Sequence, residues 1–195
     1  MCIAGITGIG ALSLGLKNAR AARRHRLEAQ TDVLTGLLNR RALFERMAEP
    51  AALRGGAVII FDLDNFKAVN DRYGHAAGDE VLRRFADALR LNIREGDIAA
   101  RTGGEEFVLV LRKASLPLAA STAERIRAIF AESRVDTEKG PVWAAASAGV
   151  ALATDDGENF EAALNRADVS LYRAKAGGRN RVVTELKLHS LRPAM

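Results

Sequence analysis

The stretch RTGGEEFVLVL, from Arg101 to Leu111, sets two glycines and two carboxylates directly before an apolar run. A Gly-Gly pair between β-forming segments is typical of a hairpin turn. Glycine there tolerates positive φ and lets the backbone approach a ligand, because it carries no Cβ. Adjacent residues on a strand point to opposite faces, so we expect Glu105 and Glu106 to have different roles. A turn of this kind suits a metal-bound phosphate, although a surface hairpin with solvated glutamates has the same pattern.

A second acidic stretch, AVIIFDLD, runs from Ala57 to Asp64. Its continuous apolar part, bounded by turn residues, predicts a strand that is buried on both faces. The period of two places Asp62 and Asp64 on one face and Leu63 on the other. A carboxylate at the end of a buried strand needs a partner to offset its desolvation, and a divalent ion supplies one. We favour metal binding for Asp62, whereas for Asp64 a cap on the following helix is at least as good an interpretation.

The charge of the chain is concentrated near its N-terminus. The 195 residues carry a formal net charge of +5, and the segment 17–26 alone contains five basic residues and no acidic one. The remainder is therefore neutral, and the basic pI does not indicate a nucleic-acid-binding body. The single cysteine, Cys2, permits no disulfide within the chain and fits a reducing compartment.

Residues 1–16 are apolar and uncharged, and the basic segment follows them directly. The run is shorter than the roughly 20 residues of a spanning helix. We favour the end of a transmembrane helix that anchors the following domain to the membrane on its cytoplasmic side, because a basic flank marks that side. A signal-like or flexible tail is the alternative. We expect a basic connector helix at 17–31, a globular domain at 32–187 and a tail at 188–195.

The periodicity of the globular part predicts an α+β domain, with a ferredoxin-like or palm-like antiparallel sheet flanked by helices. The chain reads as helix, strand, two helices, hairpin, helix, strand, helix and strand. In the helix expected at 117–133, we expect Ile126, Ile129 and Phe130 to face the core of the domain. The expected helices include 40–48, 80–92, 117–133 and 160–176, and the further strands are 98–102, 142–152 and 181–183.

Polar residues between these elements have two readings each. Asn70 and Asp79 have the donors and acceptors to read the edge of a base, but either residue could simply cap a helix. His75 taken alone is more often structural. Lys175 and Arg179 are solvated charges at a helix end unless a phosphate lies nearby.

Five stretches, in order, resemble the GGDEF family of diguanylate cyclases. The resemblance covers roughly Thr31 to Thr184 and departs little from the family pattern, with Glu105 in place of aspartate and Leu38 where many members have proline. The stretches are DVLTGLLNRR (32–41), FDLDNFKAVND (61–71), YGHAAGDEVL (73–82), RTGGEEF (101–107) and ADVSLYRAKAGGRNRV (167–182).

The resemblance implies an enzyme that joins two GTP into the bacterial second messenger cyclic di-GMP and releases two pyrophosphates. Asp62 and Glu105 resemble the ligands of two Mg²⁺ ions, with Mn²⁺ as an alternative, and Leu63 and Glu106 are further candidates. Glu105 is also the candidate base for the attacking hydroxyl. Asn70 and Asp79 resemble the guanine readers, with His75 nearby. The candidate phosphate contacts are Lys67, Lys175 and Arg179, and Phe66, Gly103 and Gly104 complete the set of GTP-binding residues.

The resemblance also implies regulation and assembly. Arg94 and Asp97 stand where the family often carries an inhibitory site for its product, and Arg125 is a candidate second contact. Each domain would hold one GTP, so catalysis requires a homodimer. The alternatives are a catalytically silent receptor for GTP or cyclic di-GMP, and another nucleotidyl cyclase, against which the guanine readers argue.

Overall fold

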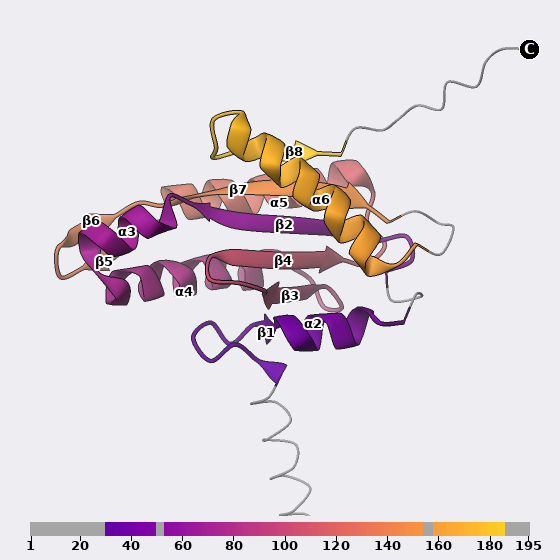
Figure 1. Ribbon diagram of the computed structural model, residues 1–195, viewed down its shortest axis with the longest axis horizontal. Coiled ribbons are helices and arrows are strands. Elements are labelled where there is room, and N and C mark those ends of the chain that lie inside the picture. Colours follow the sequence, from indigo (N-terminus) through magenta and orange to yellow (C-terminus); the bar gives the residue numbers. More distant parts are fainter. Residues whose placement is uncertain (1–29, 50–52, 154–157, 186–195) are drawn as a thin grey trace, which may run out of the picture.

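The computed structural model of the protein describes residues 30–49, 53–153 and 158–185 (Figure 1). The apolar run at 1–16, nearly all of the connector at 17–31 and the tail at 188–195 lie outside the described residues. Among those described, no helix is both long and apolar enough to cross a membrane.

A six-stranded sheet in the order β1-β3-β4-β2-β7-β8 forms the centre of the domain. The central strand β2 pairs antiparallel with both β4 and β7, which confirms the expected antiparallel core. The edge strands β1 and β8 are parallel to their neighbours. The strands are β1 Leu38–Asn39, β2 Ala57–Asp64, β3 Ile98–Arg101, β4 Glu106–Leu111, β7 Ala145–Leu152 and β8 Val182–Thr184, with a separate pair β5 Val135–Thr137 and β6 Gly140–Val142.

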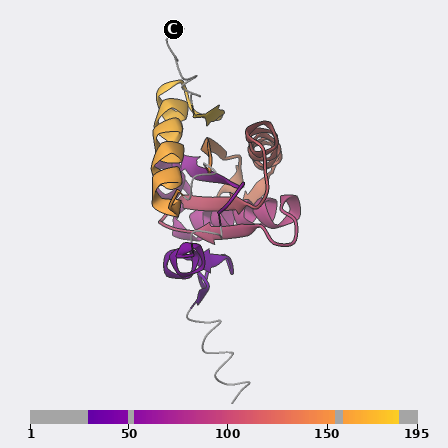
Figure 2. The same cartoon turned by 90° about the vertical axis from the view of Figure 1, so that its right-hand side faces the viewer.

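Helices cover both faces of the sheet, as Figure 2 shows end-on. Helices α4 and α5 pack on one face and α6 packs on the other, with α2 beside it. Because strand residues alternate, Ile59 and Phe61 face α4 and α5, whereas Val58 and Ile60 face α2 and α6. The helices are α2 Arg40–Met47, α3 Phe66–Tyr73, α4 His75–Asn92, α5 Leu116–Glu132 and α6 Phe160–Ala176.

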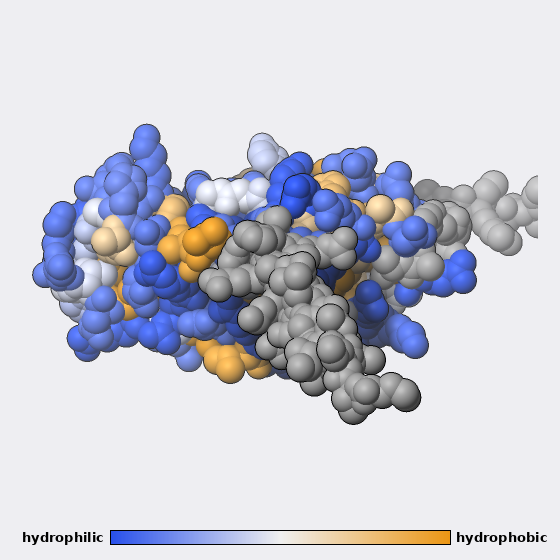
Figure 3. Space-filling model, turned by 90° about the horizontal axis from the view of Figure 1, so that it is seen from below, coloured by the Kyte–Doolittle hydropathy of each residue, from blue (hydrophilic) through white to orange (hydrophobic). Residues whose placement is uncertain are grey.

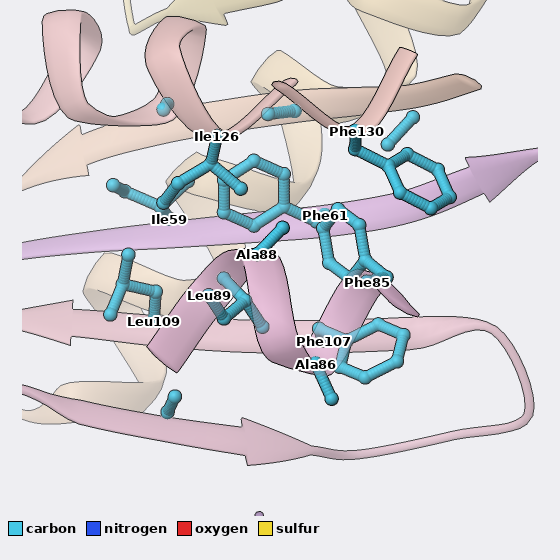
Figure 4. Close-up of a cluster of buried hydrophobic side chains, with 14 of the residues drawn as sticks. Ile59, Phe61, Phe85, Ala86, Ala88, Leu89, Phe107, Leu109, Ile126 and Phe130 are labelled. Atoms are coloured by element: carbon cyan, nitrogen blue, oxygen red, sulfur yellow. The ribbon is translucent and has the colours of Figure 1, made fainter. Parts of the chain in front are cut away.

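Phe85 of α4 is the centre of the larger core cluster (Figure 4). Its ring centroid lies 5.3 Å from that of Phe61, 4.8 Å from that of Phe107 and 4.9 Å from that of Phe130. Edge-on and tilted contacts of this kind add to the burial of the rings. The ring contacts join β2, β4, α4 and α5 next to the end of β2 that carries Asp62 and Asp64.

Three features of the fold differ from expectation. Helix α4 begins at His75 rather than Glu80, directly after Gly74. Ile129 was expected to face the core but is 41% exposed, whereas Ile126 and Phe130 are buried. The short strand β1 and the β5–β6 pair were not expected, because their segments lack an apolar run of useful length.

The surface is dominated by polar and charged side chains. On the face seen in Figure 3, hydrophilic residues prevail and the apolar ones form small separate patches. Isolated exposed apolar side chains are normal for a globular domain. The sites discussed below are therefore recognised by their charge and geometry rather than by an apolar surface.

Candidate active site

Two carboxylates lie at the C-terminal end of β2, on the face that α6 covers. Asp62 and Asp64 are each only 8% exposed. The Nζ atom of Lys175, in the last turn of α6, lies 2.7 Å from Oδ2 of Asp62. The structure thus brings a predicted metal ligand and a predicted phosphate contact together, from segments more than a hundred residues apart.

Asp64 has a different role from the helix cap considered for it. Its Oδ1 accepts a hydrogen bond from Ser147 Oγ at 2.7 Å, and its Oδ2 accepts one from the backbone N–H of Asn180 at 2.9 Å. The residue at the N-cap of α3 is Asn65, which makes no side-chain capping bond. The cap interpretation is therefore wrong, and Asp64 ties β7 and the turn after α6 to β2.

The protein does not fully compensate the charge of Asp62. Burial raises the pKa of Asp62, and the hydrogen bond and charge of Lys175 lower it only in part. The negative charge of Asp64 also raises the pKa of Asp62, whereas the positive charge of Arg179 lowers it. A buried carboxylate with an elevated pKa favours the approach of another cation.

The hairpin from β3 to β4 places both glutamates beside the end of β2. Glu106 is the cross-strand partner of Asp62, so both side chains project from the same face of the sheet. The backbone N–H of Leu63 donates to the carbonyl oxygen of Glu105 at 3.2 Å. The predicted metal-site residues thus share one corner of the sheet, and their roles as ligands stay predictions. We name this group the acidic corner: Asp62, Leu63, Glu105 and Glu106.

One of the two reasons expected for glycine in this hairpin, a positive φ, is not found, and the close approach of a ligand stays a prediction. Neither Gly103 nor Gly104 has a positive φ. A Cβ on Gly103 would lie 2.7 Å from Oε2 of Glu106, whereas a Cβ on Gly104 would meet nothing within 4 Å. Glycine at 103 therefore leaves room for the carboxylate of Glu106 where it now lies, and a larger residue would make that flexible side chain shift.

Arg101 braces the hairpin, a role that the sequence analysis missed. Its Nε and Nη2 atoms donate to the carbonyl oxygen of Gly104 at 3.1 and 2.7 Å. Its Nη1 atom donates to both carboxylate oxygens of Asp32, at 3.2 and 3.3 Å. Asp32 also accepts from the N–H of Thr35 at 2.9 Å, so the first turn of the domain is bonded to the acidic hairpin.

The turn after α6, residues 177–181, carries Arg179 beside Asp62. Arg179 and Asn180 both adopt the left-handed conformation, with φ of 63° and 46°. The charge of Arg179 is close enough to lower the pKa of Asp62. We name residues 177–181 the basic turn. Lys67 is exposed in the first turn of α3, three residues after Asp64.

The candidate guanine readers lie where α3 meets α4. Asn70 is on α3 and Asp79 is on α4, next to Gly78. A Cβ on Gly78 would overlap Oδ1 of Asn70 and lie 3.2 Å from Cζ of Phe66. The missing side chain of Gly78 therefore leaves the space that Asn70 fills. His75 is exposed at the first position of α4.

The acidic corner fits a metal ion that arrives with a triphosphate. No group of three His, Cys, Asp or Glu side chains in the described part of the chain is arranged to hold a metal by itself. Mg²⁺ typically uses one or two protein carboxylates and takes its other ligands from phosphate and water. Asp62 and Glu105 would hold it, with the carbonyl oxygen of Leu63.

A separate pocket of about 290 Å³ contains all three residues of the predicted product site. Arg94 Nη2 donates to the carbonyl oxygen of Arg112 at 2.8 Å, and Arg125 Nη2 to that of Asn92 at 3.0 Å. The side chain of Asp97 is 3% exposed. Its two oxygens accept the N–H groups of Arg94 and Arg112, so it shapes the loop, and its contact with a base stays a prediction.

Comparison with known proteins places this geometry in a family context. The family model described as "Diguanylate cyclase, GGDEF domain" matches residues 29–181. The chain is 42% identical over 175 residues to the diguanylate cyclase DgcP of Pseudomonas aeruginosa, which covers 85% of this chain and 26% of DgcP. It is 43% identical over 167 residues to the response regulator PleD of Caulobacter vibrioides, which covers 82% of this chain and 37% of PleD. The chain thus spans well under half of these relatives.

A solved structure agrees with the fold. The coiled coil and GGDEF domain of DgcB from Caulobacter crescentus, in complex with c-di-GMP, superposes with a TM-score of 0.79. The match covers 90% of this chain and 97% of that one, at 30% identity. The likeness therefore extends over the whole described domain.

Proposed function

Because this chain belongs to the GGDEF domain family of diguanylate cyclases, we propose that it condenses two GTP into cyclic di-GMP and two pyrophosphates. The observation that carries the proposal is the acidic corner, where Asp62 meets Lys175 at 2.7 Å and the Glu105 backbone joins that of Leu63. Carboxylates and a lysine at one point provide for a metal and for the phosphates of a nucleotide.

The protein's contribution to the reaction is to hold and orient two charged substrates. The 3′-oxygen of one GTP attacks the α-phosphorus of the other, the bond to the β-phosphate oxygen breaks, and pyrophosphate leaves. Glu105 takes the proton of the hydroxyl, and Lys67, Lys175 and Arg179 bind the phosphate oxygens. Two Mg²⁺ ions, when bound, neutralise the charge that develops on the transferred phosphate.

Guanine selectivity follows from hydrogen bonding at the junction of α3 and α4. Asp79 accepts from N1–H and the exocyclic amine of guanine, a donor pattern that adenine lacks. Asn70 supplies a donor and an acceptor beside it. ATP would leave these groups unpaired, so we propose that the enzyme rejects ATP.

Each domain offers one such site, so we propose that two copies face each other and that the reaction needs a homodimer. We also propose that cyclic di-GMP binds the pocket of Arg94 and Arg125 and inhibits the enzyme. The stacking surface and paired donors of arginine suit a guanine base and a phosphate. Attachment to the inner membrane through residues 1–16 stays a proposal.

The test is to incubate the purified protein with GTP and Mg²⁺ and to measure pyrophosphate and cyclic di-GMP, together with Glu105→Gln and Asp79→Ala variants. We expect product from the wild type, none from Glu105→Gln, and weaker discrimination between GTP and ATP in Asp79→Ala. A dimeric wild type that binds GTP and releases no pyrophosphate would instead support the catalytically silent receptor.

A further inference from the structure

Arg127 of α5 makes a long-range contact with the basic turn. Its Nη1 atom donates to Oδ1 of Asn180 at 2.6 Å, across 53 residues of sequence. The Arg127 side chain is only 16% exposed, although α5 belongs to the other face of the sheet from α6. This contact joins α5, on one face of the sheet, to the turn that follows α6, on the other face.

The guanidinium of Arg127 is fixed before it reaches the turn. Its Nε atom donates to both oxygens of Glu124, at 3.0 and 2.9 Å, one helical turn earlier. A guanidinium is planar, so its bonds to Glu124 set the direction of its remaining donor. Arg127 therefore presents Nη1 to Asn180 with little loss of rotational freedom.

The backbone of Arg179 and Asn180 is held from two sides. Both residues adopt the left-handed region, which asparagine tolerates but which residues such as arginine rarely adopt. Asp64 fixes the backbone of Asn180 from the sheet side through its N–H, at 2.9 Å. Arg127 fixes the side chain of the same residue from α5. These two contacts add to the backbone hydrogen bonds that Gly177, Gly178 and Arg179 make to the last turn of α6.

We propose that Arg127 is a positioning residue that sets the affinity of the site for the triphosphate of GTP, by holding Asn180 and with it Arg179. The inference rests on the proposed function, in which Lys175 and Arg179 bind the phosphates. Arg127 itself touches Glu124 and Asn180 and makes no contact with the acidic corner in this structure. Its effect is therefore on the phosphate part of the ligand and not on the base.

The experiment compares Arg127→Gln, Asn180→Gly and the double variant with the wild type in the full chain. Glycine keeps the left-handed conformation at 180 while it removes the acceptor for Arg127. The readout is the dissociation constant, with Mg²⁺, of a GTP analogue that cannot react, and of guanosine as a competitor. The matched control is Arg83→Gln on α4. It removes another pair of the Glu-x-x-Arg type, in which Arg83 Nη1 lies 3.1 Å from Oε2 of Glu80.

We expect each single variant to bind the GTP analogue about tenfold more weakly, because the turn is then no longer held in place beforehand and ordering it on binding costs free energy. Guanosine affinity should stay unchanged, and the double variant should bind no more weakly than either single one, because the two side chains act through one contact. Arg83→Gln should match the wild type.

Three results would overturn the inference: unchanged affinity for the analogue in a folded Arg127→Gln variant, equal weakening of analogue and guanosine, or multiplied effects in the double variant. The readout is binding, so it is separate from turnover. A wild type that binds the analogue but forms no product refutes the proposed function and leaves the inference standing, whereas a wild type that does not bind the analogue refutes both.

Discussion

At the scale of one residue, Asp62 is placed where its buried charge lowers the stability of the free protein and favours the binding of a cation. A carboxylate that is 8% exposed loses most of its hydration, and Lys175 restores only part of that loss. The raised pKa of Asp62 records the difference. The sequence was sufficient to single out Asp62, because an acid follows a long apolar run. It did not indicate Ser147 or Asn180, which reach Asp64 from distant segments without any local pattern.

Replacing Asp62 with asparagine should separate stability from activity. The folded-state pKa of Asp62 is raised, so the wild type gains stability below the unfolded pKa and loses it as the pH rises through the folded value. At neutral pH without nucleotide, Asp62→Asn should therefore be at least as stable as the wild type in thermal unfolding, yet inactive with GTP. A variant that unfolds far more easily at neutral pH would show that the charge is well compensated.

Asp32 should behave in the opposite sense. Burial acts to raise the pKa of Asp32, but the hydrogen bonds from Thr35 and the pairing with Arg101 outweigh it and lower the pKa. Its stabilising effect is present above the unfolded pKa of about 3.9 and is lost as the pH falls through the folded value. Urea unfolding should show Asp32→Asn less stable by about 1 kcal/mol at pH 7. A deficit that persists undiminished at pH 3 would contradict this account.

At the scale of elements, the helices and the long strands could be predicted from periodicity, and the short elements could not. Helix α6 matches its expected range, 160–176, because Asn159 caps its start and glycines follow its end. The start of helix α4 was predicted too late, at 80 instead of His75, because the stretch from His75 to Asp79 has no apolar period. The close fit of Gly78 against Asn70 is visible only in the folded chain. Ile129 satisfies the helical spacing but lies at the margin of the buried face.

Gly78 offers a test of the α3–α4 junction. In Gly78→Ala the added Cβ would overlap Oδ1 of Asn70, so the amide must leave its position. We expect the KM for GTP to rise about tenfold, as the loss of one or two hydrogen bonds to the base predicts. The control is the same substitution in an Asn70→Ala background, where the new methyl group has room and should add little. If Gly78→Ala raised the KM by the same factor in the wild type and in the Asn70→Ala background, the substitution would not act through Asn70.

At the scale of the whole molecule, helix α5 contributes residues to two proposed sites, the product pocket and the site for the phosphates. Arg125 lines the proposed product pocket with Asn92 of α4, and Arg127 contacts the basic turn. The sequence indicated all three residues, Arg94, Asp97 and Arg125, and the folded chain brings them to one pocket. How residues 1–29 meet the domain lies outside the described residues.

The product pocket can be tested by inhibition. Arg125→Ala removes a cation from the pocket and should weaken inhibition by cyclic di-GMP about tenfold or more, with turnover at low product unchanged. Arg134→Ala, which removes a cation paired with Asp136 outside the pocket, is the control and should be inhibited like the wild type. Equal inhibition of Arg125→Ala and wild type would exclude this pocket as the regulatory site.

The central claim, that two GTP are joined across two copies of the acidic corner, is tested most directly by product formation as a function of protein concentration. With GTP and Mg²⁺ in excess, the account predicts two pyrophosphates for each cyclic di-GMP. Activity per molecule should rise with protein concentration until the dimer is saturated. Conversion of GTP to GDP and phosphate, or activity per molecule that stays constant down to concentrations where the protein is monomeric, would contradict it.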